Sequence, residues 1–136
     1  MKPSRVLFVC VGNACRSQMA EGFARTYGRD VMEVTSAGLM PAYEIPAQTR
    51  KVMLEKGIDL GEQFPKPAME MDLGRFDLVI NISGYPLPEV AADRRRDWAV
   101  RDPVGEKDAV HRKVRDEIEG LVMKLVLELR MRRRKI

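Results

Sequence analysis

The fold is decided by the stretch Val6-Leu7-Phe8-Val9-Cys10-Val11-Gly12-Asn13-Ala14-Cys15-Arg16-Ser17. Its first five residues form a continuous apolar run, which is typical of a strand buried on both faces of a parallel sheet. Gly12 and Asn13 end this run with a turn. From Ser17 onward apolar residues recur on one helical face, with Ser17 as a candidate N-cap and Gly28 as a stop. The stretch therefore predicts a strand, a short loop and a helix in direct succession.

The alternation of strands and helices continues along the rest of the chain. Further elements are expected as strands at residues 31–36, 77–82 and 98–100, and as helices at 46–57 and 110–129. Residues 64–73 carry two prolines and are expected to be irregular or only briefly helical. This order favours an α/β fold, with an open, mainly parallel sheet and helices on both faces, in one domain spanning 1–136.

Composition limits the classes of function. A net charge of +4 suits anionic ligands, but much of the excess lies in two basic runs, 94–96 and 130–135. No aromatic residues interleave these runs, so nucleic-acid binding is not expected. The chain has no uninterrupted run of about 18 apolar residues, so no contact with a membrane is expected. Two cysteines, Cys10 and Cys15, cannot form a disulfide framework, and we expect a cytoplasmic protein that is a monomer.

The loop between the first strand and the first helix is suited to binding a tetrahedral oxyanion. Backbone N–H groups at the start of a helix have no intrahelical acceptors, and the helix dipole favours negative charge there. Gly12 allows close approach of the backbone, and Asn13 is expected to hold the turn. The candidate substrate-binding residues are those of the loop: Val11, Gly12, Asn13, Ala14, Cys15 and Arg16.

Three side chains of this stretch are candidate catalytic residues. A cysteine at the base of an anion-binding loop is stabilised as a thiolate, so Cys10 is expected to be a nucleophile rather than an ordinary buried strand cysteine. The planar guanidinium of Arg16 offers paired donors to two equatorial oxygens and binds them more tightly in the transition state. The Ser17 hydroxyl can donate to the sulfur and make it a better leaving group.

Departure of an alkoxide or phenoxide also needs a proton donor, and Asp102 is the candidate. Pro103 biases Asp102 away from helical geometry and stiffens its loop, although Asp-Pro is also a common turn signal. His111, the single histidine, is expected to be solvated on the polar face of the last helix. No cluster has the spacing of metal ligands, so neither a metal nor another cofactor is expected.

The segment from Cys10 to Ser17 resembles the phosphate-binding loop of low-molecular-weight protein tyrosine phosphatases and of the related thioredoxin-linked arsenate reductases. Matching features recur at Ser36-Ala37-Gly38, Phe76-Asp77-Leu78-Val79 and Asp102-Pro103. The resemblance covers nearly the whole chain. It implies a three-layer αβα fold with a four-stranded parallel sheet and a phosphate-binding loop after the first strand. It also implies that Asp102 is the general acid.

The loop alone does not choose between hydrolysis and reduction, because arsenate resembles phosphate. The segments Gln18–Gly22 and Val114–Ile118 are similar to the reductases. These reductases carry redox cysteines after the third strand, however, and residues 81–88 contain none. The other thiol, Cys15, is expected to be structural or to form a reversible protective disulfide with Cys10.

We therefore expect a phosphomonoester hydrolase of the protein tyrosine phosphatase type. Its substrate is a phosphorylated protein or a small aryl phosphate, and Tyr43 is a candidate for one wall of the site. The alternative is an arsenate reductase that uses Cys10 and an external thiol or a thioredoxin-like partner. A second alternative is a non-catalytic oxyanion-binding module.

Overall fold

The computed structural model describes residues 2–134, so Lys135, which belongs to the second basic run, lies outside the described residues. Along the chain the strands and α-helices are β1 (Ser4–Cys10), α1 (Arg16–Tyr27), β2 (Met32–Gly38), α2 (Ala47–Leu54), β3 (Leu78–Asn81), β4 (Arg95–Asp97) and α3 (Asp108–Arg134). Short 3-10 turns are η1 (Ala68–Glu70), η2 (Leu73–Arg75) and η3 (Ala92–Arg94). Among these residues no helix is long and apolar enough to cross a membrane.

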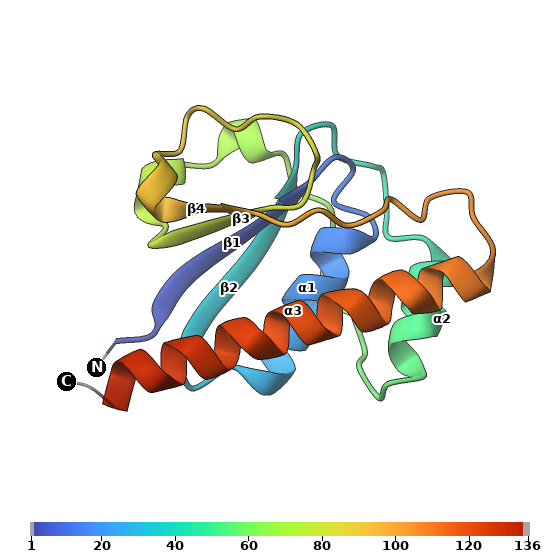
Figure 1. Cartoon of the computed structure of the whole chain (residues 1–136). Coiled ribbons are helices and arrows are strands. Elements are labelled where there is room, and N and C mark those ends of the chain that lie inside the picture. The colour runs from blue at the N-terminus through green and yellow to red at the C-terminus, as the bar shows by residue number, and fades with distance from the viewer. Residues whose placement is uncertain (1, 135–136) are drawn as a thin grey trace.

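All four strands form one parallel sheet in the order β2-β1-β3-β4. The α/β fold predicted from the sequence is confirmed. Figure 1 shows that α1, α2 and α3 lie on the same side of this sheet, with α3 packed against α1 and α2. The carboxyl ends of the strands meet at one edge, where ligands bind in open sheets of this kind.

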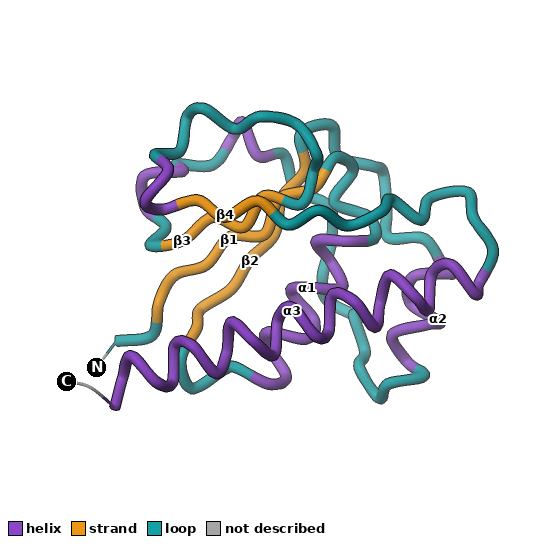
Figure 2. The backbone as a smooth tube through the Cα atoms, viewed as in Figure 1, coloured by secondary structure: helices purple, strands orange, loops and turns teal. Residues whose placement is uncertain are grey.

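Side chains of β1 alternate between the two faces of the sheet. Val6 and Phe8 join a core formed with the three α-helices, whereas Leu7 and Val9 point to the opposite face. That second face is covered by the 3-10 turns and by loops, as Figure 2 shows. The sequence predicted helices on both faces of the sheet. The second face carries only short 3-10 turns, because the proline-containing segment before β3 forms single turns rather than an α-helix.

Two local predictions were wrong. The fourth strand lies at Arg95–Asp97 and not at 98–100. It is an edge strand, and an edge strand tolerates polar residues. The apolar residues 98–100 that follow it therefore gave a stronger strand pattern than the strand itself. Trp98 still donates its backbone N–H to the carbonyl of Asn81 (2.9 Å) and packs against Phe8. His111 is buried rather than solvated, and neither ring nitrogen has a hydrogen-bond partner among the described residues.

Candidate functional site

The candidate site is the loop that joins β1 to α1 at the carboxyl end of the sheet. Cys10 is the last residue of β1, and Arg16 is the first residue of α1. Asn13 has a positive φ of 49°, which asparagine tolerates better than most residues and which lets the loop turn sharply. Gly38, beside Cys10 in β2, leaves room for this turn, since an added Cβ would lie 2.8 Å from the Val11 carbonyl oxygen.

The Cys10 sulfur is buried and has two polar neighbours. The Ser17 Oγ lies 2.9 Å from it, and the Asn13 backbone N–H donates to it at 3.2 Å. The Asn13 amide nitrogen donates to the Ser17 Oγ (2.7 Å), so the hydroxyl proton of Ser17 is available to the sulfur. Ser17 lies inside α1 and does not cap it, because the helix begins one residue earlier with Cys15 as N-cap.

The turn at Asn13 is held by residues that the sequence did not identify. Gln18 donates its side-chain amide to the Asn13 carbonyl oxygen (3.0 Å) and to the Phe64 carbonyl oxygen (3.0 Å). The backbone N–H of Lys66 donates to the Asn13 Oδ1 (2.9 Å). Gln18 is fully buried, but the burial of a single polar residue leaves no periodic signal in a sequence.

Arg16 lies under the loop and is 5% exposed. Its Nη1 donates to the carbonyl oxygens of Ile82 (2.7 Å) and Val100 (3.0 Å), which follow β3 and β4. Among the described residues, its Nε and Nη2 make no hydrogen bond, so two donors remain for an oxyanion. The ends of two strands thus fix one edge of the guanidinium and leave the other edge to a ligand.

Asp102 approaches the same guanidinium from the loop after β4. Its Oδ2 lies 3.7 Å from the Arg16 Nη2, and its Oδ1 accepts a hydrogen bond from the backbone N–H of Val104 (3.1 Å). The side chain is 48% exposed, so both solvent and a substrate can reach the carboxylate. The structure thus brings together the four residues predicted to be catalytic, Cys10, Arg16, Ser17 and Asp102, while the remaining loop residues 11–15 lie between β1 and α1.

Cys15 differs from Cys10 in its surroundings. It is buried, it accepts a hydrogen bond from the Thr49 hydroxyl (3.1 Å), and burial raises the pKa of its thiol to about 11. A thiol with this pKa is almost entirely protonated at neutral pH and is a poor nucleophile. Ser83, in the segment 81–88 that contains no cysteine, is also buried and donates its hydroxyl to the Asn81 Oδ1 (2.6 Å).

A buried carboxylate lies below the loop. Glu21 accepts hydrogen bonds from the hydroxyl of Ser36 (2.6 Å) and from Arg25 (2.8 Å). The ammonium of Lys66 lies 3.9 Å from Glu21, and desolvation lowers the pKa of this lysine although Glu21 opposes the effect. The chain's own cations therefore balance Glu21. Among residues 2–134 no group of three or more His, Cys, Asp or Glu side chains is arranged to hold a metal ion.

The loop after β2, which runs beside the candidate site, carries exposed apolar side chains. Met40 donates its backbone N–H to the Val11 carbonyl oxygen (2.8 Å), and Ala42 donates to the carbonyl oxygen of Gly12 (2.8 Å). Met40 is 76% exposed and Tyr43 is 99% exposed. Tyr43 therefore belongs to a segment whose backbone is bonded to the loop between β1 and α1, and its role as a wall of the site stays a prediction.

Comparison with known proteins shows one family and several named activities. The family described as low molecular weight phosphotyrosine protein phosphatase matches residues 5–135. A glutaredoxin arsenate reductase from Synechocystis is 36% identical over 129 residues, which cover 92% of this chain and 98% of the relative.

Two solved structures are also similar over nearly their whole length. An arginine phosphatase, YwlE from Geobacillus stearothermophilus, is 28% identical with a TM-score of 0.86, covering 98% of this chain and 97% of the other. A low-molecular-weight protein tyrosine phosphatase from T. tengcongensis is 30% identical with a TM-score of 0.81, covering 92% and 99%. Relatives with the same fold thus carry names for three different reactions.

Proposed function

Because the chain belongs to the low-molecular-weight phosphotyrosine protein phosphatase family, we propose that it hydrolyses phosphomonoesters through a phosphocysteine on Cys10, as a protein tyrosine phosphatase. The observation that carries this proposal is the position of Asp102. Its carboxyl group lies 3.7 Å from the guanidinium that would hold the phosphoryl oxygens, which supports a role for Asp102 in exchanging a proton with the ester oxygen. The oxygen expelled when a thiol attacks arsenate takes a proton as well, so the choice of hydrolysis over reduction rests also on the lack of cysteine in residues 81–88.

In the first step, the Cys10 thiolate attacks phosphorus while the bond to the ester oxygen breaks. The leaving oxygen takes the bond's electron pair and a proton from Asp102. The loop N–H groups and the two remaining donors of Arg16 bind the three equatorial oxygens, on which charge spreads in the transition state. This step releases the alcohol and leaves a phosphocysteine.

In the second step, water attacks the phosphocysteine. The Asp102 carboxylate takes a proton from the water, the phosphorus–sulfur bond breaks, and its electron pair returns to the Cys10 sulfur. The Ser17 hydroxyl, 2.9 Å from that sulfur, stabilises the thiolate that leaves. Inorganic phosphate is released and the enzyme returns to its starting state.

Arsenate reduction is the second candidate, favoured by the names of relatives such as the Synechocystis enzyme. Reducing arsenate to arsenite takes two electrons, which two thiols supply when they are oxidised to a disulfide. Cys10 can supply one thiol. The other thiol in the sequence, Cys15, is buried with a raised pKa, so an external small thiol or a thioredoxin-like partner would have to supply the second.

One preparation assayed for both reactions separates the two candidates. We expect hydrolysis of p-nitrophenyl phosphate that is abolished in Cys10→Ser and Arg16→Ala, slowed in Asp102→Asn, and retained in the control Cys15→Ser. If arsenite forms with glutathione or thioredoxin while the aryl phosphate is not hydrolysed, the phosphatase proposal is wrong. Binding of phosphate with neither turnover would identify a non-catalytic oxyanion-binding module.

The cellular site of action that we propose is the cytoplasm. Both cysteines are unpaired thiols, and the proposed chemistry needs Cys10 reduced. A reducing compartment keeps it so.

A further inference from the structure

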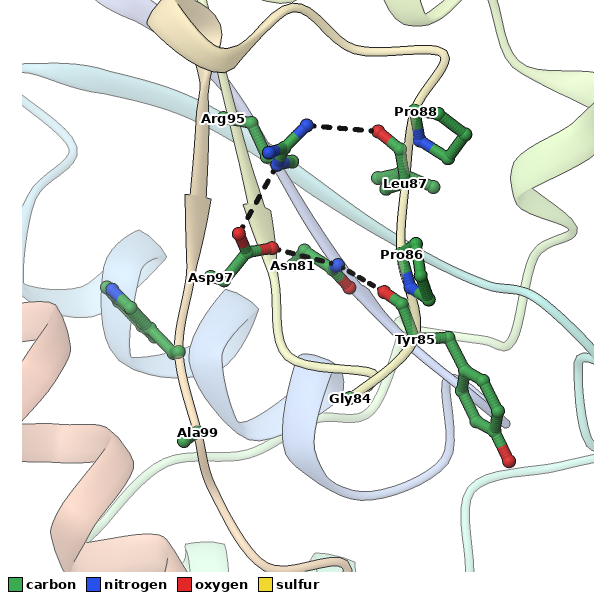
Figure 3. A pocket seen from close by; sticks show the side chains of 10 residues that line it. Asn81, Gly84, Tyr85, Pro86, Leu87, Pro88, Arg95, Asp97 and Ala99 are labelled. Atoms are coloured by element: carbon green, nitrogen blue, oxygen red, sulfur yellow. Dashed lines mark hydrogen bonds and ion pairs between the residues drawn. The ribbon is translucent and has the colours of Figure 1, made fainter.

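A groove of about 510 Å³ lies beside the candidate site and takes no part in the chemistry proposed above. One wall is β4 with its continuation, which presents Arg95, Asp97 and Ala99, and the other wall is the loop Gly84–Pro88. Figure 3 shows these two segments facing each other, with Asn81 between them. Its volume is within the range of about 300–1,000 Å³ that is usual for ligand pockets.

Hydrogen bonds hold the two walls in place. The Asn81 amide nitrogen donates to the Tyr85 carbonyl oxygen (2.7 Å) on one side and to the Asp97 Oδ1 (3.0 Å) on the other. Arg95 donates from Nη1 to the carbonyl oxygens of Leu87 (3.4 Å) and Val90 (2.9 Å). The groove is therefore formed before any ligand arrives, so a ligand does not have to order its walls.

Asp97 is the more exposed of the two charged side chains that line the groove. Its side chain is 61% exposed, whereas that of Arg95 is 25% exposed and is engaged with backbone carbonyls and, through Nε, with the Asp97 Oδ2 at 3.3 Å. Each carboxylate oxygen of Asp97 accepts one hydrogen bond from the protein and can accept another. The adjacent wall carries Tyr85, Pro86 and Pro88, whose apolar surfaces suit the methylene stem of a long side chain.

The groove is continuous in sequence with the anchors of the candidate site. Ala99 precedes Val100, and Asn81 precedes Ile82, whose carbonyl oxygens both hold Arg16. The register of the sheet pairs Val9 with Asn81 and Asn81 with Asp97, so two strand spacings, about 10 Å, separate Asp97 from the residue that precedes Cys10. A polypeptide whose phosphorylated residue lies over Cys10 can therefore reach the groove with a residue about three positions away.

We propose that this groove binds a basic side chain, lysine or arginine, of the polypeptide substrate about three residues from the phosphorylated residue, with Asp97 as the specificity-determining carboxylate. This inference rests on the proposed phosphatase function and adds a substrate class to it: phosphoproteins with a basic residue near the phosphotyrosine. The stem of the basic side chain packs on the proline wall, and its charge pairs with Asp97.

The test compares phosphotyrosyl peptides that carry Lys, Ala or Glu at the third position, in one series before the phosphotyrosine and in another after it. We expect kcat/KM to be about threefold higher for Lys than for Glu in one of the two series, as for a partly exposed ion pair. Asp97→Lys should invert this preference. Asp97→Asn, which keeps an acceptor for Asn81, should remove it without changing hydrolysis of p-nitrophenyl phosphate.

Glu89→Lys is the matched control, because Glu89 is exposed on the same loop, does not line the groove and changes charge by the same amount. It should keep the preference for Lys. An equal shift in Glu89→Lys, or no preference in either series while p-nitrophenyl phosphate is hydrolysed, would overturn the groove proposal and leave the phosphatase function standing. Failure to hydrolyse the aryl phosphate itself would instead remove the function on which the proposal rests.

Discussion

Ser17 offers the sharpest test of the proposed two-step reaction, because its hydroxyl contacts the sulfur, which is the leaving group only in the second step. Ser17→Ala deletes the 2.9 Å hydrogen bond to the Cys10 sulfur, together with the 2.7 Å bond that the Asn13 amide donates to the Ser17 Oγ. A hydrogen bond to a charged group contributes about 1.5–3 kcal/mol. Since each 1.36 kcal/mol corresponds to a tenfold change in rate, release of the thiolate should slow by about 10- to 160-fold.

This loss should appear mainly in the second step, when the sulfur is the leaving group. Stopped-flow mixing of Ser17→Ala with p-nitrophenyl phosphate should therefore show a burst of p-nitrophenol, close to one equivalent per enzyme, followed by slow turnover. Trapping of phosphocysteine by acid quench measures the same intermediate. Ser83→Ala is the control, because Ser83 is a buried serine bonded to Asn81 rather than to Cys10. Ser17→Ala turnover equal to wild type, without a burst, would refute the role assigned to Ser17.

Two further predictions concern the loop and the second thiol. Gly38→Ala should destabilise the protein by about 1–3 kcal/mol in urea unfolding and reduce phosphate binding, because the added Cβ would meet the backbone of Val11. Gly120→Ala is the control: it has open space around it and should stabilise α3 by about 0.5–1 kcal/mol. Equal changes in unfolding free energy for the two variants would contradict this reasoning. Because burial raises the pKa of Cys15 from 9.0 to about 11, the folded state holds this proton more tightly, and stability should fall as pH rises from 9 to 11. Urea unfolding at these two pH values should show a smaller fall in Cys15→Ser than in wild type, and an equal fall would argue against the buried, protonated thiol.

The sequence predicted the parts of the site that are local. Cys10 and Arg16 flank a single loop, and their types and spacing at a strand-to-helix junction carry the chemistry in one short stretch. Pro103 marks the loop of Asp102, but the resemblance to the family was needed to separate Asp102 from an ordinary Asp-Pro turn. Their assembly in the structure follows from the parallel sheet, which brings the carboxyl ends of β1, β3 and β4 to one edge.

The supporting contacts could not be predicted, because they join residues that are far apart in the chain through backbone atoms. The carbonyl groups of Ile82 and Val100 that anchor Arg16 belong to residues of any type, so no side chain signals them. Gln18 and Lys66 act on the turn at Asn13 in the same way, one through an amide and the other through its backbone N–H. Such contacts depend on how the segments pack and not on local patterns.

His111 was misplaced for a related reason. It lies in the stripe of α3 that continues through Val114 and Ile118, at spacings of three and four, and this stripe packs into the core. The polar side chain of His111 suggested that it lies on a solvated face, but its position on the helix places it in the core. The two unpaired ring nitrogens show that this burial was not compensated by hydrogen bonds among the described residues.

Arg16 is held by two backbone carbonyl groups, and one of them belongs to the segment that follows the short edge strand of the sheet. Val100 follows β4, a three-residue strand that pairs only with β3 at the open edge. Edge segments of this kind fray at free energies well below that of global unfolding. When β4 frays, Arg16 loses one of its two carbonyl partners while the core around β1 stays folded. Activity should therefore decline on warming before the circular-dichroism transition begins, so that turnover reports on local opening of the sheet edge.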